Sequence, residues 1–214
     1  MRNDRFKLAT EFAHDGNIEG WSKGGGVPSI LWRSHVTMWA ASNGLRLEGD
    51  FVECGVHTGI LSMAICHYLD FNKINKKFYL FDTFQGIPME RLDETDRLQA
   101  ERINSLIYFD VYEIAKRNFS TFKNVQLIKG NLPDTLDIPD LQKISYLSID
   151  LNNARYEKET IEALWEKLVD GAMVVIDDYA FTGHEAQYQM WNDFASRNNR
   201  IILTVPTGQG LLVK

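Results

Sequence analysis

The chain has 214 residues, a formal net charge of −6, and hydrophobic, aromatic and charged fractions of 44%, 12% and 24%. These values are ordinary for a globular protein of one domain, and the acidic balance argues against a general nucleic-acid binder. No apolar run is long enough to span a bilayer, and the first residues lack the apolar core of a signal peptide. We therefore expect a cytoplasmic protein without a membrane partner, in which Cys54 and Cys66 are buried thiols rather than a disulfide.

Residues 1–48 are expected to form a separate, mostly helical and loop segment ahead of a domain that spans residues 49–214. Within this segment, residues 22–29 read SKGGGVPS, which cannot hold regular structure and is a candidate mobile lid. Trp21, Trp32 and Trp39 could stack on a ring of a substrate, or they could pack against the sheet or a partner chain.

Apolar runs alternate with amphipathic stretches from residue 50 onwards. The predicted strands are residues 51–56, 76–82, 124–130, 143–151, 172–179, 200–205 and 206–214. The predicted helices are residues 58–69, the second half of the charged region 90–119, residues 156–171 with Gly171 as the C-terminal stop, and residues 183–199.

Near-continuous runs of Val, Ile, Leu and Phe separated by helices are typical of strands buried on both faces of a parallel sheet. Only a Pro-Thr-Gly turn separates the last two predicted strands, and a parallel pair needs a much longer crossover. The sequence therefore predicts a doubly wound α/β fold, with a seven-stranded, mostly parallel sheet that ends in an antiparallel strand.

The stretch GDFVECGVHTG, residues 49–59, places Glu53 at the end of the first strand and Gly55 and Gly59 in the turn that follows. Ligands of open parallel sheets bind at this position. The glycine spacing differs from the G-x-G-x-x-G of dinucleotide sites, and a carboxylate would repel pyrophosphate. Glu53 therefore suits a ligand with a positive charge, such as an ammonium group, unless it only caps the next helix.

Asp82 ends the second strand, where doubly wound folds place an acid that binds ribose hydroxyls. A ligand with a ribose and a cationic or zwitterionic tail would meet both acids, and S-adenosylmethionine (SAM) has both groups. The alternative for Asp82 is an ordinary turn residue.

Three further acids follow the fourth and fifth strands, namely Asp150, Asp177 and Asp178. If those strands are neighbours, the carboxylates converge and raise one another's pKa, unless a hard divalent cation such as magnesium binds them. The alternative is that one Asp caps a helix while the others face solvent. His184, at a predicted helix start, is either a further site residue or a plain surface histidine.

Five stretches taken together resemble the class I SAM-dependent O-methyltransferases, and most closely the macrocin-type enzymes that methylate macrolide sugars. They are E-C-G-V-x-x-G, FDTFQGIP, KGNLPDTL, SIDLNNARYEKET and VVIDDY, and the resemblance runs from about residue 47 to the C-terminus. It implies a Rossmann-like methyltransferase fold and methyl transfer to a hydroxyl of a sugar, glycan or natural-product precursor. It also leaves open a homo-oligomer.

The resemblance implies a role for each matching residue. The residues that it places around the methionine part of SAM are Glu53, Gly55, Val56, His57, Thr58 and Gly59. The residues that it places at the ribose, adenosine and adenine are Asp82, then Thr83 and Phe84, then Gly130 and Asn131. Asp150, Asp177 and Asp178 would hold magnesium, with Asp150 also near the donor methyl group.

The chain departs from the related patterns at two positions and in the spacing from Asp150 to Tyr156, which is longer than in the macrolide-sugar enzymes and bears on the identity of the acceptor. In the catechol-type enzymes D-x-x-K-x-R-Y supplies a catalytic lysine, whereas residues 150–156 read DLNNARY and carry Asn153 at the lysine position. We therefore expect Asp150 to take the proton of the acceptor hydroxyl, with His184 as the alternative base. Leu61 stands where macrolide-sugar enzymes often carry a serine near the methionine carboxylate.

Other functions are compatible with parts of this pattern. An NAD-type oxidoreductase is disfavoured by the glycine spacing and by the lack of an obvious Tyr-x-x-x-Lys motif. A SAM-binding module without catalytic activity would not need the three acids. A structural subunit of a larger assembly remains a third alternative.

Overall fold

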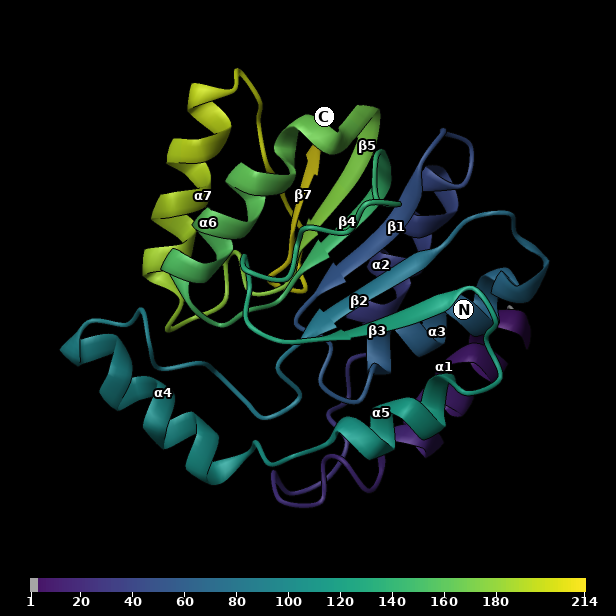
Figure 1. The fold of residues 1–214 in the computed structure, drawn as a ribbon, viewed down its shortest axis with the longest axis horizontal. Helices are drawn as coiled ribbons and strands as arrows, with labels where there is room; N and C mark the ends of the chain where they lie inside the picture. The colour runs from purple at the N-terminus through teal and green to yellow at the C-terminus, as the bar shows by residue number, and fades with distance from the viewer. Residues whose placement is uncertain (1–3) are drawn as a thin grey trace.

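Seven strands form one mixed sheet in the part of the chain that the structure describes, residues 4–214 of a computed structural model (Figure 1). The strands are β1 (Asp50–Cys54), β2 (Phe78–Asp82), β3 (Val125–Lys129), β4 (Ile144–Ile149), β5 (Leu168–Ile176), β6 (Leu203–Thr204) and β7 (Gly210–Val213). The α-helices are α1 (Asp4–Asn17), α2 (Leu31–Gly44), α3 (Ile60–Leu69), α4 (Glu94–Leu106), α5 (Tyr112–Phe119), α6 (Ala154–Leu164) and α7 (Glu185–Arg197).

The strand order is β3-β2-β1-β4-β5-β7-β6. Strands β1 to β5 are parallel to their neighbours among themselves, and β7 is antiparallel to both β5 and β6. This confirms the predicted doubly wound sheet and its antiparallel C-terminal hairpin. The order reverses between β1 and β4, so the carboxyl ends of these two strands border the crevice where such sheets bind ligands.

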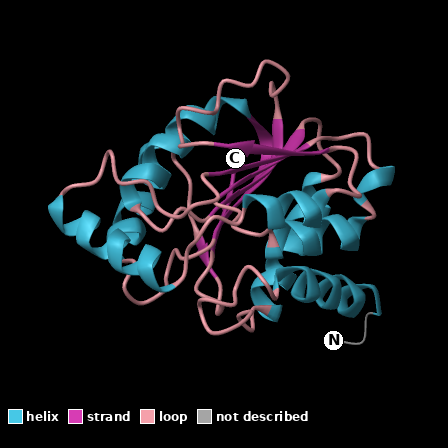
Figure 2. Ribbon diagram, turned by 60° about the horizontal axis from the view of Figure 1, so that its bottom comes forward, coloured by secondary structure: helices cyan, strands magenta, loops and turns pink. Residues whose placement is uncertain are grey.

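Helices cover both faces of the sheet (Figures 1 and 2). On β1, Phe51 packs into the cluster that contains residues of α2, α3 and α5, whereas Val52 and Cys54 pack into the cluster that contains residues of α6 and α7. The N-terminal helix α1 contacts α3 and α2. Burial on both faces explains why the central strands are continuously apolar rather than alternating.

The predicted end of the helix at Gly171 was wrong. Helix α6 ends at Leu164, and after a single 3-10 turn β5 begins at Leu168, so Gly171 lies inside the strand. The pairing with β4 is irregular there, because Ile144 faces Leu168 but Tyr146 faces Met173. Gly171 has a φ of 84°, a left-handed conformation that lets the strand absorb the extra residues as a bulge.

The charged region forms two helices, α4 and α5, rather than helix in its second half alone. Helix α4 begins after Asp93, whose side chain accepts a hydrogen bond from the backbone N–H of Asp96 at 2.9 Å. In Figure 1, α4 stands away from the sheet, beyond the carboxyl ends of the strands.

Cys54 and Cys66 are both buried and free, as predicted. Within residues 4–214, every helix is too short or too polar to traverse a bilayer.

Candidate active site

A pocket opens at the carboxyl ends of β1, β2 and β4, where the strand order reverses. The empty space between its walls, including the part that is open to solvent, is about 840 Å³. Its wall combines strand-end residues with Tyr108, which follows α4, and Trp21, which precedes the glycine-rich loop of residues 22–29. Segments that are far apart in the sequence therefore meet around one cavity.

Gly55 allows the turn after β1 to lie directly against the chain after β4. Its φ is 87°, and a Cβ atom at this position would be 1.8 Å from the backbone oxygen of Asp150. Any side chain would push the two segments apart. Gly55 therefore sets the position of Asp150 relative to the pocket.

Asp82 holds the same turn from the side of β2. Its Oδ2 atom accepts hydrogen bonds from the backbone N–H groups of Val56 at 2.5 Å and His57 at 2.7 Å. Its Oδ1 atom accepts one from the N–H of Phe84 at 2.5 Å. Asp82, the expected ribose ligand, thus lines the pocket. Its carboxylate also holds the backbone of the turn after β1 by these hydrogen bonds.

Three polar atoms of pocket residues are buried and have no hydrogen-bond partner among residues 4–214: Glu53 Oε2, His57 Nε2 and Trp21 Nε1. A buried polar atom without a partner costs about 1–3 kcal/mol. Burial raises the pKa of Glu53 to about 8, and the nearby Asp177 and Asp82 add to this effect while a hydrogen bond from Ser62 opposes it. Burial also lowers the pKa of His57. A zwitterionic ligand could donate a hydrogen bond to Glu53 Oε2 and accept one from Trp21 Nε1.

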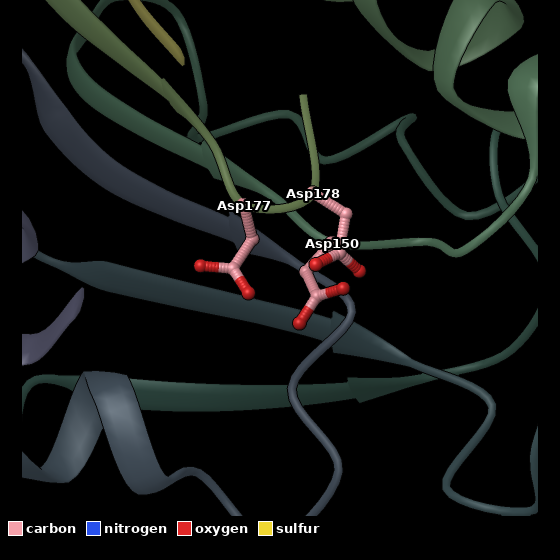
Figure 3. A group of neighbouring side chains, drawn as sticks. All are labelled: Asp150, Asp177 and Asp178. Atoms are coloured by element: carbon pink, nitrogen blue, oxygen red, sulfur yellow. The ribbon is translucent and has the colours of Figure 1, made fainter. Parts of the chain in front are cut away.

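Asp150, Asp177 and Asp178 converge at the ends of β4 and β5, as predicted (Figure 3). Ile149, the last residue of β4, faces Ile176, the last residue of β5. The residues that follow them are therefore neighbours, and they are Asp150 and Asp177. The backbone N–H of Asp177 donates to the backbone oxygen of Ile149 at 3.0 Å. One oxygen of each carboxylate lies within 4.8 Å of the others. Carboxylate oxygens are the hard donors that magnesium prefers, so the donor set fits a divalent cation.

Arg33, from the first turn of α2, already contacts two of these acids. Its Nη1 atom donates to Asp178 Oδ1 at 3.0 Å and also to Asp177 Oδ2. The other oxygen of Asp177 accepts a hydrogen bond from Gln209 Nε2 at 2.8 Å. The N-terminal segment therefore contributes a cation to the acid cluster, which we define as Asp150, Asp177 and Asp178.

Arg33 offsets only part of the mutual repulsion among the three carboxylates. Burial raises the pKa of Asp150 well above its ordinary range, the charges of Asp177 and Asp178 raise it further, and Arg33 lowers it. Burial likewise raises the pKa of Asp177 to about 6, with Arg33 as the largest opposing influence. One guanidinium compensates three carboxylates only in part, which leaves the cluster attractive to a further cation.

His184 lies beside the cluster at the start of α7. Its Nε2 atom is 3.7 Å from Asp178 Oδ2, and its Nδ1 atom is 2.7 Å from Gln187 Nε2. It therefore contacts the acid cluster on the side of Asp178.

The structure brings most of the predicted site residues to the pocket wall: Glu53, Gly55, Val56, His57, Asp82, Thr83, Phe84, Gly130 and Asp150. Thr58, Gly59 and Asn131 have other contacts. Thr58 donates its hydroxyl to Asn17 Oδ1, and a Cβ at Gly59 would lie 2.4 Å from the ring of Phe119. Asn131 Nδ2 donates weakly to Glu90 Oε2 at 3.5 Å.

The sequence did not identify Arg33, Tyr108 or Asn152. Asn152 Nδ2 donates to Asp150 Oδ1 at 3.2 Å and lies 3.4 Å from the hydroxyl of Tyr108. Asn152 could have been noticed, because it lies two residues after the strand-end acid Asp150 and Asn tolerates the left-handed φ of 56° that it adopts. Arg33 and Tyr108 belong to segments whose local pattern carries no functional signal.

The three tryptophans of the N-terminal segment differ in their environment. Trp21 lines the pocket and packs edge-on against His57, with ring centroids 4.9 Å apart. Trp32 and Trp39 are 65% and 50% exposed.

Comparison with known proteins gives one family and one curated relative. The model of the TylF family, macrocin O-methyltransferase, matches residues 39–204. The chain is 30% identical over 146 residues to the demethyldecarbamoylnovobiocin O-methyltransferase of Streptomyces niveus. That alignment covers 64% of this chain and 55% of the relative, so the chain spans about half the length of the curated relative it matches.

Solved structures share the fold. The O-methyltransferase NovP superposes with a TM-score of 0.78 at 21% identity, over 98% of this chain and 97% of that chain. The calicheamicin methyltransferase CalS11 superposes with a TM-score of 0.69 at 17% identity, over 87% of this chain and 80% of that chain. At these identities the likeness establishes the Rossmann-like methyltransferase fold alone.

Proposed function

The chain belongs to the TylF family of macrocin O-methyltransferases, and from this premise we propose that it transfers the methyl group of SAM to a hydroxyl of a small molecule. We propose a sugar or another natural-product precursor as the acceptor. The support for this class is the family itself and the curated relative, which is named for the methylation of demethyldecarbamoylnovobiocin.

The pocket wall supports SAM as the methyl donor, and this is the observation that carries the proposal. Glu53 Oε2 is a buried acceptor and Trp21 Nε1 is a buried donor, and neither has a partner in the described chain. The methionine part of SAM carries an ammonium group and a carboxylate, so we assign the ammonium to Glu53 and the carboxylate to the side of Trp21. Trp21 would thereby supply the donor that Leu61, which also lines the pocket, lacks.

Asp150 connects the donor pocket with the acid cluster, because it belongs to both. In the proposed reaction the acceptor oxygen bonds to the methyl carbon while the carbon–sulfur bond of SAM breaks. The hydroxyl proton passes to a carboxylate oxygen of Asp150, and the products are the methyl ether and S-adenosylhomocysteine. Asn153 is unsuited to this role, because its Oδ1 caps α6 by accepting hydrogen bonds from the N–H groups of Arg155 and Tyr156 at 3.0 and 3.2 Å.

The acid cluster would hold magnesium, since its three carboxylates form a hard-oxygen donor set. When bound, the ion supplies the Lewis acidity that eases loss of a proton from a hydroxyl. His184 remains the alternative base, because it contacts the cluster through Asp178.

Replacement of Asp150 by Asn tests the proposed base. We expect the rate of methyl transfer at saturating magnesium to fall about 100-fold or more, because general-base catalysis contributes at least that much. The measurement is transfer from labelled SAM to a panel of sugars and glycosides, with SAM affinity determined separately by calorimetry.

Asp170→Asn is the matched control, since Asp170 is exposed on β5. A rate for Asp150→Asn within a few-fold of the wild-type rate would remove Asp150 from this role. If the wild-type protein does not bind SAM at all, the proposed function itself is wrong.

A further inference from the structure

Arg33 contacts the acid cluster at the position where a metal ion would bind. We propose that Arg33 is a resident counter-cation that competes with a divalent metal ion for Asp177 and Asp178, so that metal binding displaces its guanidinium. This inference rests on the proposed metal site and goes beyond it, because it assigns a residue that regulates occupancy of the cluster.

The contacts show that protein donors already engage the carboxylate oxygens. Asp177 Oδ2 accepts from Arg33 and Asp177 Oδ1 accepts from Gln209. Asp178 Oδ1 accepts from Arg33 at 3.0 Å, and Asp178 Oδ2 lies 3.7 Å from His184 Nε2. A metal ion that binds both aspartates would therefore share two carboxylates with Arg33, whose guanidinium lies within hydrogen-bonding distance of each.

The balance of charge favours exchange over a permanent ion pair. Arg33 supplies one positive charge to a cluster of three carboxylates, whereas a magnesium ion supplies two in a smaller volume. The side chains of Arg33 and Asp177 are only 15% and 7% exposed. Solvent therefore screens only weakly the attraction of each cation to the acids and the repulsion between the two cations. The guanidinium stabilises the metal-free cluster, and its presence weakens metal binding.

The position of Arg33 links this exchange to the glycine-rich loop. Arg33 is the third residue of α2 and lies four residues after the end of the segment 22–29. Its guanidinium also lies over the ring of Phe181 at 5.1 Å. These contacts fasten the start of α2 to the end of β5. Displacement of the guanidinium would remove its contacts with Asp177, Asp178 and Phe181. Metal binding should therefore increase the mobility of the segment that leads into α2.

Binding of Mn²⁺ to the SAM-free protein tests the competition. Free Mn²⁺ can be measured by electron paramagnetic resonance for the wild type, Arg33→Gln and Arg33→Lys. We expect Arg33→Gln to bind Mn²⁺ about tenfold more tightly or better, because a neighbouring cation changes the affinity of a carboxylate for a positive charge by that order. Arg33→Lys keeps the charge and should remain close to the wild type.

Two controls locate the effect. Arg117→Gln removes an exposed arginine that pairs with Glu19 and should leave Mn²⁺ affinity unchanged. Asp177→Asn in the Arg33→Gln background should abolish the gained affinity, which places the ion at the acid cluster. Equal or weaker Mn²⁺ binding by Arg33→Gln, including binding by neither protein, would overturn the proposal.

A second measurement uses the wild type alone and remains decisive if Arg33→Gln is too unstable to study. Saturating magnesium should increase hydrogen–deuterium exchange in residues 22–34, and unchanged exchange with metal bound would count against displacement. SAM binding, measured by calorimetry without metal, reports separately on the proposed function. A protein that binds SAM but fails the metal tests would retain the function and lose this inference.

Discussion

At the scale of single residues, Gly55 determines how closely the pocket turn approaches the backbone of Asp150. We expect Gly55→Ala to lower the free energy of unfolding by about 3 kcal/mol or more, because it combines a left-handed backbone with a steric clash. A Cβ there would lie 1.8 Å from the Asp150 backbone oxygen. Urea denaturation measures the loss, and calorimetry should show weaker SAM binding.

Gly25→Ala is the matched control for this substitution. Gly25 has nearly the same φ, 91° against 87°, but no described atom lies within 4 Å of the Cβ that it would carry. It should cost only the backbone strain, about 1 kcal/mol. Equal losses for the two variants would show that close approach at Gly55 is unimportant.

Much of the candidate site was predictable at this scale, because parallel strands deliver their carboxyl ends to one edge of the sheet. Asp150, Asp177 and Asp178 follow strands, and the structure brings them together. Arg33 could not be predicted in the same way, because its partner Asp177 is 144 residues away and no local pattern distinguishes this arginine.

At the scale of elements, a buried carboxyl joins α6 to α7. Glu157 Oε2 accepts a hydrogen bond from Trp191 Nε1 at 2.7 Å, and both side chains are buried. Burial raises the pKa of Glu157 to about 8 from an ordinary value of 4.5. The folded protein therefore keeps this proton to a higher pH than the unfolded chain does, and its stability falls as the pH rises from about 4.5 to about 8.

Glu157→Gln should remove this dependence on pH while it keeps an oxygen acceptor for Trp191. We expect the free energy of unfolding to fall between pH 5 and pH 8.5 by less than in the wild type, with a difference on the order of 2–4 kcal/mol. Urea denaturation across this range provides the measurement. Glu162→Gln, a half-exposed position on the same helix, is the control and should follow the wild type. Parallel curves for Glu157→Gln and the wild type would contradict the assignment.

The boundaries of elements were less predictable than their existence. The pattern of residues 156–171 continues helical spacing past Leu164, yet β5 begins at Leu168 because Ile144 of β4 offers it a partner there. Hydrogen bonding to a neighbouring strand is a tertiary effect, and it overrides local helix propensity.

At the scale of the whole molecule, hydrogen bonds connect the N-terminal segment to the last turn of α4 and to the residues that follow this helix. Lys23 Nζ donates to the backbone oxygens of Asn104 at 3.2 Å and Tyr108 at 2.9 Å. Trp21 and Tyr108, at the two sides of this connection, both line the pocket. This arrangement is consistent with the prediction from the sequence that residues 22–29 act as a lid.

Lys23→Met should loosen that lid without altering the pocket wall. We expect SAM to dissociate about threefold to tenfold faster, as the loss of one or two exposed hydrogen bonds implies. Stopped-flow displacement of bound SAM by excess S-adenosylhomocysteine measures the rate. Lys7→Met, on the exposed side of α1, is the control. An unchanged dissociation rate for Lys23→Met would show that the connection does not retain the donor.

The sequence by itself determined the doubly wound sheet, its antiparallel end and the acids at the strand ends. Each of these depends on local information: continuous apolar runs, short turns, and the residue that follows each strand. Only the tertiary structure decided that Arg33 pairs with the acid cluster, that Trp21 and Tyr108 complete the pocket, and that β5 begins before Gly171. These features depend on contacts between distant segments, which form when the whole chain packs and which leave no periodic signal in the sequence.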